Sequence, residues 1–287
     1  MPRHTCVSGP IRWRKPATAG TAPAASASAA SASAVTGLNG WFTNDGLRLA
    51  RYLVAPTGHD LKPIPGVPAL ILCHGFPVGP IDARLSANTF PEFVDRASNA
   101  LGWAAMTFTF RGCGQSEGSF SLAGWMSDLS AAIDHLIAEV EPSTIMAVGT
   151  STGGSIALCV AETNPSVNGV AVLGARSDFS DWAGDPLRFL AHCREVGTVT
   201  DPEFPADFEA WSAELAVFDP ARAAAALAPR PLLVLHGDDD EVPLSHGRRL
   251  VDAHGSGSLR VIHGGGHRLR HDPRAVAQLL GWLSRQV

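Results

Sequence analysis

The residues best able to do chemistry in this chain surround a serine near its middle. Ser151 stands between Gly149 and Gly153 in a G-x-S-x-G pattern, which follows a short apolar run at residues 144–148 and opens a stretch typical of a helix. A sharp turn from strand to helix lifts its corner side chain clear of the sheet, and small residues on either side relieve the crowding. The pattern therefore predicts that Ser151 is a nucleophile.

A serine hydroxyl is a poor nucleophile at neutral pH, so it needs a base to take its proton and a carboxylate to orient that base. Loops after two later apolar runs can supply both groups. The carboxylates are those of Asp238, Asp239 and Asp240, and the base is His267. The resulting chain order is serine, aspartate, histidine.

Other histidines compete with His267 for the role of base, namely His263 and His271. Only His267 ends a run of glycines, which gives an imidazole room to approach a serine. The amide of Thr152 would lie at a helix N-terminus, where unpaired N–H groups and the helix dipole favour an anion. Thr152 is therefore a candidate donor to an oxyanion.

Alternating strands and helices must position these loops. We expect strands over residues 41–43, 47–55, 68–73, 104–110, 144–148, 169–173, 231–235 and 258–262, and helices over 122–140, 152–163, about 245–253 and after Pro273. The first two strands form a hairpin around Asp45-Gly46. The alternation predicts an α/β fold with a doubly wound, mainly parallel sheet flanked by helices.

The alternation lapses over about residues 176–228, a segment that holds seven of the twenty aromatic residues. Two interpretations stay open. The segment consists of loop and helices packed on the core, or it forms a short inserted cap whose aromatic side chains shape an acyl pocket. We expect one domain over residues 37–287 that contains this insertion.

Residues 1–36 combine four basic residues with an Ala/Ser tract and contain no acid. Such a segment cannot build a core, and we expect a disordered tail. It lacks the apolar run of a secretory signal, although its composition overlaps with that of organellar transit peptides.

Composition narrows the class of partner. The formal net charge of −5 is spread without long like-charge blocks, which speaks against nucleic acid, and no apolar stretch is long enough to span a membrane. The five cysteines have unrelated spacings and indicate free thiols in a reducing, cytoplasmic compartment. No metal-binding pattern occurs, and we expect neither metal nor cofactor. The sequence leaves the oligomeric state open.

With these motifs in this order, residues 38–287 resemble the α/β-hydrolase superfamily. The resemblance implies that Asp240, placed by the pattern H-G-x-x-D-x-x-P, is the triad acid and that His267 is the base. It also implies that the amide of Phe76, in a His-Gly-Phe-Pro stretch, joins that of Thr152 in an oxyanion hole. An R-G-x-G-x-S loop that begins at Arg111 matches a loop that lies near the site in this family.

The expected activity is that of a serine hydrolase, carboxylesterase-like, which cleaves an ester or related acyl bond of a small molecule through an acyl-enzyme on Ser151. An acyltransferase, a thioesterase and an aminopeptidase are alternatives that use the same triad. A catalytically silent, ligand-binding homologue is an alternative of another class. A dinucleotide-binding oxidoreductase is disfavoured, because the glycines at 112, 114 and 118 miss the Rossmann spacing.

Overall fold

The computed structural model describes residues 37–287. The predicted disordered tail, residues 1–36, and Cys6 lie outside the described residues. The four cysteines within them, at positions 73, 113, 159 and 193, are free and buried.

A single sheet of eight strands organises the described part of the chain. The strands are β1 (Leu38–Asn44), β2 (Leu47–Val54), β3 (Ala69–Cys73), β4 (Ala104–Phe108), β5 (Ile145–Thr150), β6 (Val167–Leu173), β7 (Leu232–Gly237) and β8 (Ser258–Ile262). Their order across the sheet is β1-β2-β4-β3-β5-β6-β7-β8. Strands β1 and β2 are antiparallel to their neighbours, and every pair from β4 to β8 is parallel. The sheet is therefore mainly parallel, as predicted.

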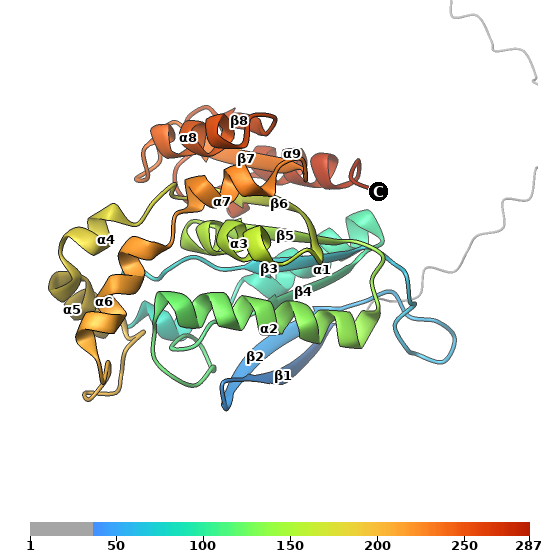
Figure 1. The fold of residues 1–287 in the computed structure, drawn as a ribbon. Helices are drawn as coiled ribbons and strands as arrows, with labels where there is room; N and C mark the ends of the chain where they lie inside the picture. The colour runs from blue at the N-terminus through green and yellow to red at the C-terminus, as the bar shows by residue number, and fades with distance from the viewer. Residues whose placement is uncertain (1–36) are drawn as a thin grey trace, which may run out of the picture. The chain divides into compact units, whose positions relative to one another are not determined.

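Helices cover both faces of this sheet (Figure 1). They are α1 (Phe90–Leu101), α2 (Leu122–Val140), α3 (Thr152–Thr163), α4 (Ser180–Gly184), α5 (Pro186–Val196), α6 (Phe208–Val217), α7 (Pro220–Leu227), α8 (Leu244–His254) and α9 (Pro273–Leu283), with short 3₁₀ turns η1 (Asp82–Leu85) and η2 (Leu269–His271). Helices α1 and α9 pack on one face, and α2, α3, α7 and α8 pack on the other. The predicted doubly wound α/β arrangement is confirmed.

Alternation along the central strands explains why the sheet holds two cores. Successive side chains of a strand point to opposite faces. In β3, Leu70 and Leu72 enter the core beneath α1 and α9, whereas Ile71 enters the core beneath α2 and α3. A strand buried on both faces is continuously apolar, which is the pattern that the sequence shows here.

Strand order reverses beside β3, which fixes where a site can form. The chain leaves β3 for β4 on one side and then returns through α2 to β5 on the other side. In open α/β sheets, ligands bind outside the carboxyl ends of the strands at such a switch point. The loops after β3 and β5, which carry Phe76 and Ser151, meet there.

The segment 176–228 contains α4, α5, α6 and α7. Helices α4 to α6 gather beside one end of the sheet (Figure 1). Helix α7 instead packs against α3 and α8. The predicted division into one domain with an inserted cap stays a prediction, with α4 to α6 as the helices that such a cap would comprise.

Candidate active site

Ser151 sits at the corner between β5 and α3 in an unusual backbone conformation. Its φ is 49° and its ψ is −127°, a backbone conformation that residues other than glycine rarely adopt. Its N–H donates a 2.8 Å hydrogen bond to the carbonyl of Leu173 at the end of β6. The neighbouring strand thus helps to hold the corner in its strained form.

Glycines surround this corner because there is no room for side chains. A Cβ on Gly149 would lie 2.4 Å from the backbone of Gly153, and a Cβ on Gly153 would lie 2.2 Å from the carbonyl oxygen of His74. A Cβ on Gly75 would lie 2.9 Å from that of Ser151. The tight corner from β5 to α3 therefore requires Gly149, and the close approach of this corner to the loop after β3 requires Gly75 and Gly153.

The structure brings Asp240 and His267 together. Nδ1 of His267 lies 2.7 Å from Oδ1 of Asp240, and the same carboxylate oxygen accepts a 2.8 Å hydrogen bond from the amide of Val242. The Asp240 side chain is fully buried, whereas that of His267 is 24% exposed. A carboxylate acceptor at Nδ1 favours the tautomer that leaves Nε2 free to accept a proton.

A second histidine holds the loop that carries Asp240. The fully buried His236 lies with Nε2 2.8 Å from the carbonyl oxygen of Val242. Since a carbonyl can only accept, Nε2 carries the proton, and the bond fixes the residue whose amide binds Asp240. His236 is thus part of the support for the acid and lies behind it.

The other candidate acids and bases from the sequence do not line the cleft that contains Ser151. Asp238 pairs with His263, Oδ2 to Nδ1 at 2.8 Å, and this pair is exposed at the surface. That hydrogen bond lowers the pKa of Asp238 below its usual range. Asp239 is exposed, and its amide donates to the carbonyl of Gly265. His271 ends η2 and does not line the cleft that contains Ser151.

His74 orients the loop that carries Phe76. Nε2 of His74 accepts a 3.1 Å hydrogen bond from the amide of Phe110, so Nδ1 carries the ring proton and donates to the carbonyl of Gly75 at 2.8 Å. Burial lowers the pKa of His74 to about 4, which keeps the ring neutral. Because the peptide is planar and trans, a fixed Gly75 carbonyl turns the N–H of Phe76 the opposite way.

The other predicted donor, the amide of Thr152, is the first of α3. Within residues 37–287 the amides of Phe76 and Thr152 donate no hydrogen bond to the protein. Two such amides at the ends of adjacent strands are available to a bound oxygen.

Ser151 and His267 line one cleft of about 300 Å³. Its walls are about equally polar and apolar, and Phe76, Leu85 and Phe90 are among the apolar residues. Four charged or titratable residues also line it, which are His74, Asp82, Arg268 and Arg270. Neither arginine was predicted as a site residue, although both follow the predicted base within three positions.

The aromatic residues of the segment 176–228 do not line this cleft. Trp182 and Phe189 stack at 4.0 Å between ring centroids, and each ring lies within 6 Å of that of Phe76. Phe179 and Trp211 are likewise buried. Trp182 and Phe189 thus pack on the core and contact Phe76, which lines the cleft, and the predicted cap stays a prediction.

The loop that begins at Arg111 is tied to the core. Nε and Nη2 of Arg111 donate to the buried carboxylate of Asp128 on α2 at 2.7 to 3.1 Å, and Nη2 also reaches Asp45 in the hairpin turn. A Cβ on Gly112 would lie 2.2 Å from the carbonyl oxygen of Thr198. The glycines of this loop therefore serve close packing.

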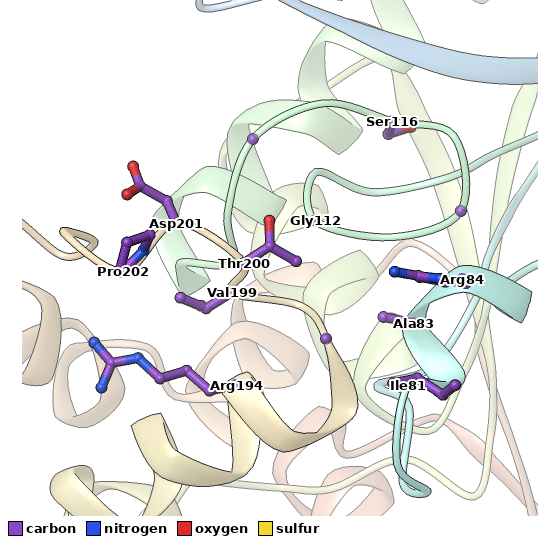
Figure 2. A pocket seen from close by; sticks show the side chains of 13 residues that line it. Ile81, Ala83, Arg84, Gly112, Ser116, Arg194, Val199, Thr200, Asp201 and Pro202 are labelled. Atoms are coloured by element: carbon purple, nitrogen blue, oxygen red, sulfur yellow. The ribbon is translucent and has the colours of Figure 1, made fainter.

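A larger pocket of about 780 Å³ lies beside that loop (Figure 2). Arg84 and Arg194 stand on opposite sides of it, and neither Ser151 nor His267 lines it. The candidate nucleophile and base thus share the smaller cleft.

Within residues 37–287 no cluster of three or more His, Cys, Asp or Glu side chains is placed to bind a metal ion. In the same part of the chain, the helices are too short or too polar to cross a membrane.

Comparison with known families gives a match over most of the chain. The model of a family described as "Alpha/beta hydrolase family" matches residues 70–279. Among curated relatives, the uncharacterized protein YfhR of Salmonella typhi is 29% identical over 145 residues, which are 47% of this chain and 44% of the relative. The alpha/beta hydrolase domain-containing protein WAV2 of Arabidopsis thaliana is 34% identical over 85 residues, 29% of this chain and 28% of the relative. The chain spans less than half the length of both relatives.

Solved structures share the fold over nearly its whole length. Est1E from Butyrivibrio proteoclasticus, solved with ferulic acid bound, aligns with a TM-score of 0.63 at 19% identity and covers 86% of this chain and 98% of that one. The esterase domain of a Rhodothermus marinus protein gives 0.60 at 23% identity, with 87% and 98% covered. The hydrolase GrgF from Penicillium sp. sh18 gives 0.64 at 17% identity, with 88% and 99% covered. At these identities the likeness establishes the fold alone.

Proposed function

The chain belongs to the alpha/beta hydrolase family, and from that premise we propose that it is a serine hydrolase that cleaves an ester or related acyl bond through an acyl-enzyme on Ser151. The observation that carries the proposal is the 2.7 Å contact between Asp240 and His267, whose ring lines the same cleft as Ser151. A nucleophile, a base and a buried orienting carboxylate are the parts that acyl transfer requires.

In the proposed reaction, Oγ of Ser151 attacks the carbonyl carbon while Nε2 of His267 takes its proton. The imidazolium then carries a positive charge that the Asp240 carboxylate stabilises across the hydrogen bond to Nδ1. His267 returns the proton to the leaving alcohol as the bond to it breaks. A water molecule, activated by the same ring, hydrolyses the acyl-enzyme and frees Ser151.

The amides of Phe76 and Thr152 are proposed to bind the oxyanion of each tetrahedral intermediate. Both are free of protein acceptors within residues 37–287, and the His74 bond to the Gly75 carbonyl orients the first of them. Donors that are already oriented act without reorganisation, and each typically contributes about a hundredfold or more in rate. The esterase structures that share this fold support the choice of an ester as substrate.

The same residues would serve a thioesterase, an acyltransferase or an aminopeptidase, since these differ in the acceptor or the leaving group. A small cleft of about 300 Å³ favours short acyl groups. Cytoplasmic location and a small-molecule acyl substrate remain part of the proposal.

The experiment uses the full chain, a fluorophosphonate probe and 4-nitrophenyl esters of graded acyl length. We expect the probe to label the wild-type protein and turnover to be fastest on short esters. Ser151→Ala should lose both, whereas the control Ser245→Ala, at an exposed position on α8, should keep both. Unchanged turnover in Ser151→Ala, or no labelling of the wild type, contradicts the proposal.

A further inference from the structure

The loop that carries His267 also brings two arginines into the wall of the cleft. Arg268 and Arg270 both line it together with Ser151. Neither guanidinium lies within 4 Å of a carboxylate among residues 37–287, whereas seven of the fifteen other arginines there have such a partner. Two cations without a carboxylate partner among the described residues thus line the same cleft as the nucleophile.

Arg270 is held in place by uncharged groups. Its Nη2 donates a 3.0 Å hydrogen bond to the hydroxyl of Thr89, and its guanidinium lies 4.9 Å from the centre of the Phe90 ring. Its Nε is buried and has no hydrogen-bond partner within residues 37–287. A buried donor without an acceptor is costly unless something else supplies one.

The two arginines make this region more positive than the chain as a whole. Burial lowers the pKa of Arg270, and the nearby charge of Arg268 lowers it further. The charge of Arg270 also contributes to the low pKa of His74. Asp82 is the one carboxylate among the described residues that line the cleft, and it already accepts a hydrogen bond from the amide of Gly79. In a chain of formal net charge −5 this is a local reversal of sign.

We propose that the substrate of this cleft carries a negatively charged group, such as a carboxylate, which Arg268 and Arg270 bind while its acyl carbonyl lies at Ser151. The proposal rests on the proposed serine hydrolase function and names its substrate class. Guanidinium groups bind carboxylates through strong, often paired, charge-assisted hydrogen bonds. A bound anion would also relieve the repulsion between the two arginines.

The first test compares matched esters that differ in charge. Mono(4-nitrophenyl) adipate and 4-nitrophenyl hexanoate place the charge on the acyl side, and 4-acetoxybenzoate and phenyl acetate place it on the leaving group. We expect kcat/KM to favour the anionic member of at least one pair by about tenfold or more, chiefly through KM, and the preference to shrink as salt is added.

Variants of the two arginines then test whether Arg268 and Arg270 cause the preference for anionic esters. Arg268→Gln should lower the ratio of kcat/KM between the anionic and the neutral ester by about tenfold, and Arg270→Gln should lower it as well. Arg270→Lys, which keeps the charge, should retain part of the preference if the packing against Phe90 is preserved. The control Arg260→Gln, at an exposed position on β8, should leave the preference unchanged. Equal turnover of both members of both pairs, or a preference that survives both Gln variants, overturns the inference.

A binding measurement keeps the two proposals separable. Adipate should bind to the wild type and to Ser151→Ala with similar Kd by titration calorimetry, about tenfold more weakly to Arg268→Gln, and adipamide should not bind. Absent adipate binding overturns the inference even if neutral esters are cleaved. Adipate binding without any ester turnover supports the anion site and contradicts the proposed function alone.

Discussion

His267 and Asp240 face each other across a 2.7 Å hydrogen bond from Nδ1 to Oδ1, although 27 positions separate them in the chain. The contact forms because β7 and β8 are parallel neighbours, so the loops at their carboxyl ends emerge side by side. A second aspartate and histidine from the same two loops, Asp238 and His263, pair 2.8 Å apart at the surface. The chain therefore offers a matched comparison between a buried pair and an exposed one.

Asp240→Asn is expected to lower kcat by about a thousandfold or more, because an amide can reverse the tautomer of His267 and cannot stabilise an imidazolium. Asp238→Asn should change kcat less than about threefold, since its partner His263 does not line the cleft. Steady-state kinetics on a neutral ester measures both, with circular dichroism as the check on folding. Equal losses in the two variants would contradict the assignment of Asp240.

Acid is expected to destabilise the protein through His74. Burial lowers its pKa from the usual 6.5 to about 4, so between these values the unfolded chain binds a proton that the folded chain does not. The free energy of unfolding should then fall with decreasing pH by about 1.4 kcal/mol per unit, or about 3 kcal/mol over the window. Urea denaturation at several pH values between 7 and 4 measures the slope.

The matched variants for this slope are His74→Asn and His59→Asn. Asparagine at position 74 can still donate and accept hydrogen bonds but cannot titrate. The free energy of unfolding of this variant should therefore depend less steeply on pH, by about 1.4 kcal/mol per pH unit, which corresponds to one proton. His59 is exposed, and its replacement should leave the slope unchanged. An identical pH dependence in wild type and His74→Asn would show that this ring does not govern acid stability.

Arg111 bridges two carboxylates whose environments differ. Asp128 is fully buried and Asp45 is 57% exposed. Asp128→Asn should destabilise the protein by about 3–5 kcal/mol, because it leaves a largely buried guanidinium without its main partner. Asp45→Asn should cost less than about 1 kcal/mol. Denaturant midpoints of the two variants test the difference, and similar midpoints would contradict a buried role for the Asp128 pair.

Gly153→Ala is expected to destabilise the protein by several kcal/mol or prevent folding, since its Cβ would lie 2.2 Å from the carbonyl oxygen of His74. Gly184→Ala is the control, because nothing lies within 4 Å of a Cβ at that position on α4. It should be neutral or stabilising by up to about 1 kcal/mol. Thermal unfolding compares the two, and a stable Gly153→Ala would mean that α3 can move away from the loop after β3.

Local patterns predicted much of the fold. Helix α2 begins after Ser121, whose hydroxyl accepts from the amide of Gly124, and helix α3 begins directly after Ser151. The hairpin turn at Asp45 and Gly46 has both residues at positive φ, as its sequence indicates. Caps, turns and apolar periodicity depend on neighbours in sequence, so they can be read without the tertiary structure.

Other features depend on contacts that sequence does not reveal. Helix α1 was absent from the predicted elements, although its Pro91 and the αL Gly102 that ends it are local signals that could have found it. The two arginines after His267 were missed for a different reason. Their place in the cleft depends on how η2 packs against α1, and the pairing of Asp240 rather than Asp238 with His267 depends on the register of β7 and β8.

At the strained corner, the residue that would give the highest stability differs from the residue that the proposed activity needs. A residue at φ 49° and ψ −127° costs about 1–3 kcal/mol unless it is glycine. Glycine at position 151 would therefore make a more stable protein that lacks the hydroxyl. If the proposed function is right, this is a position where a search for thermostable variants would select against activity, and a variant that gains stability there should be screened for turnover before it is kept.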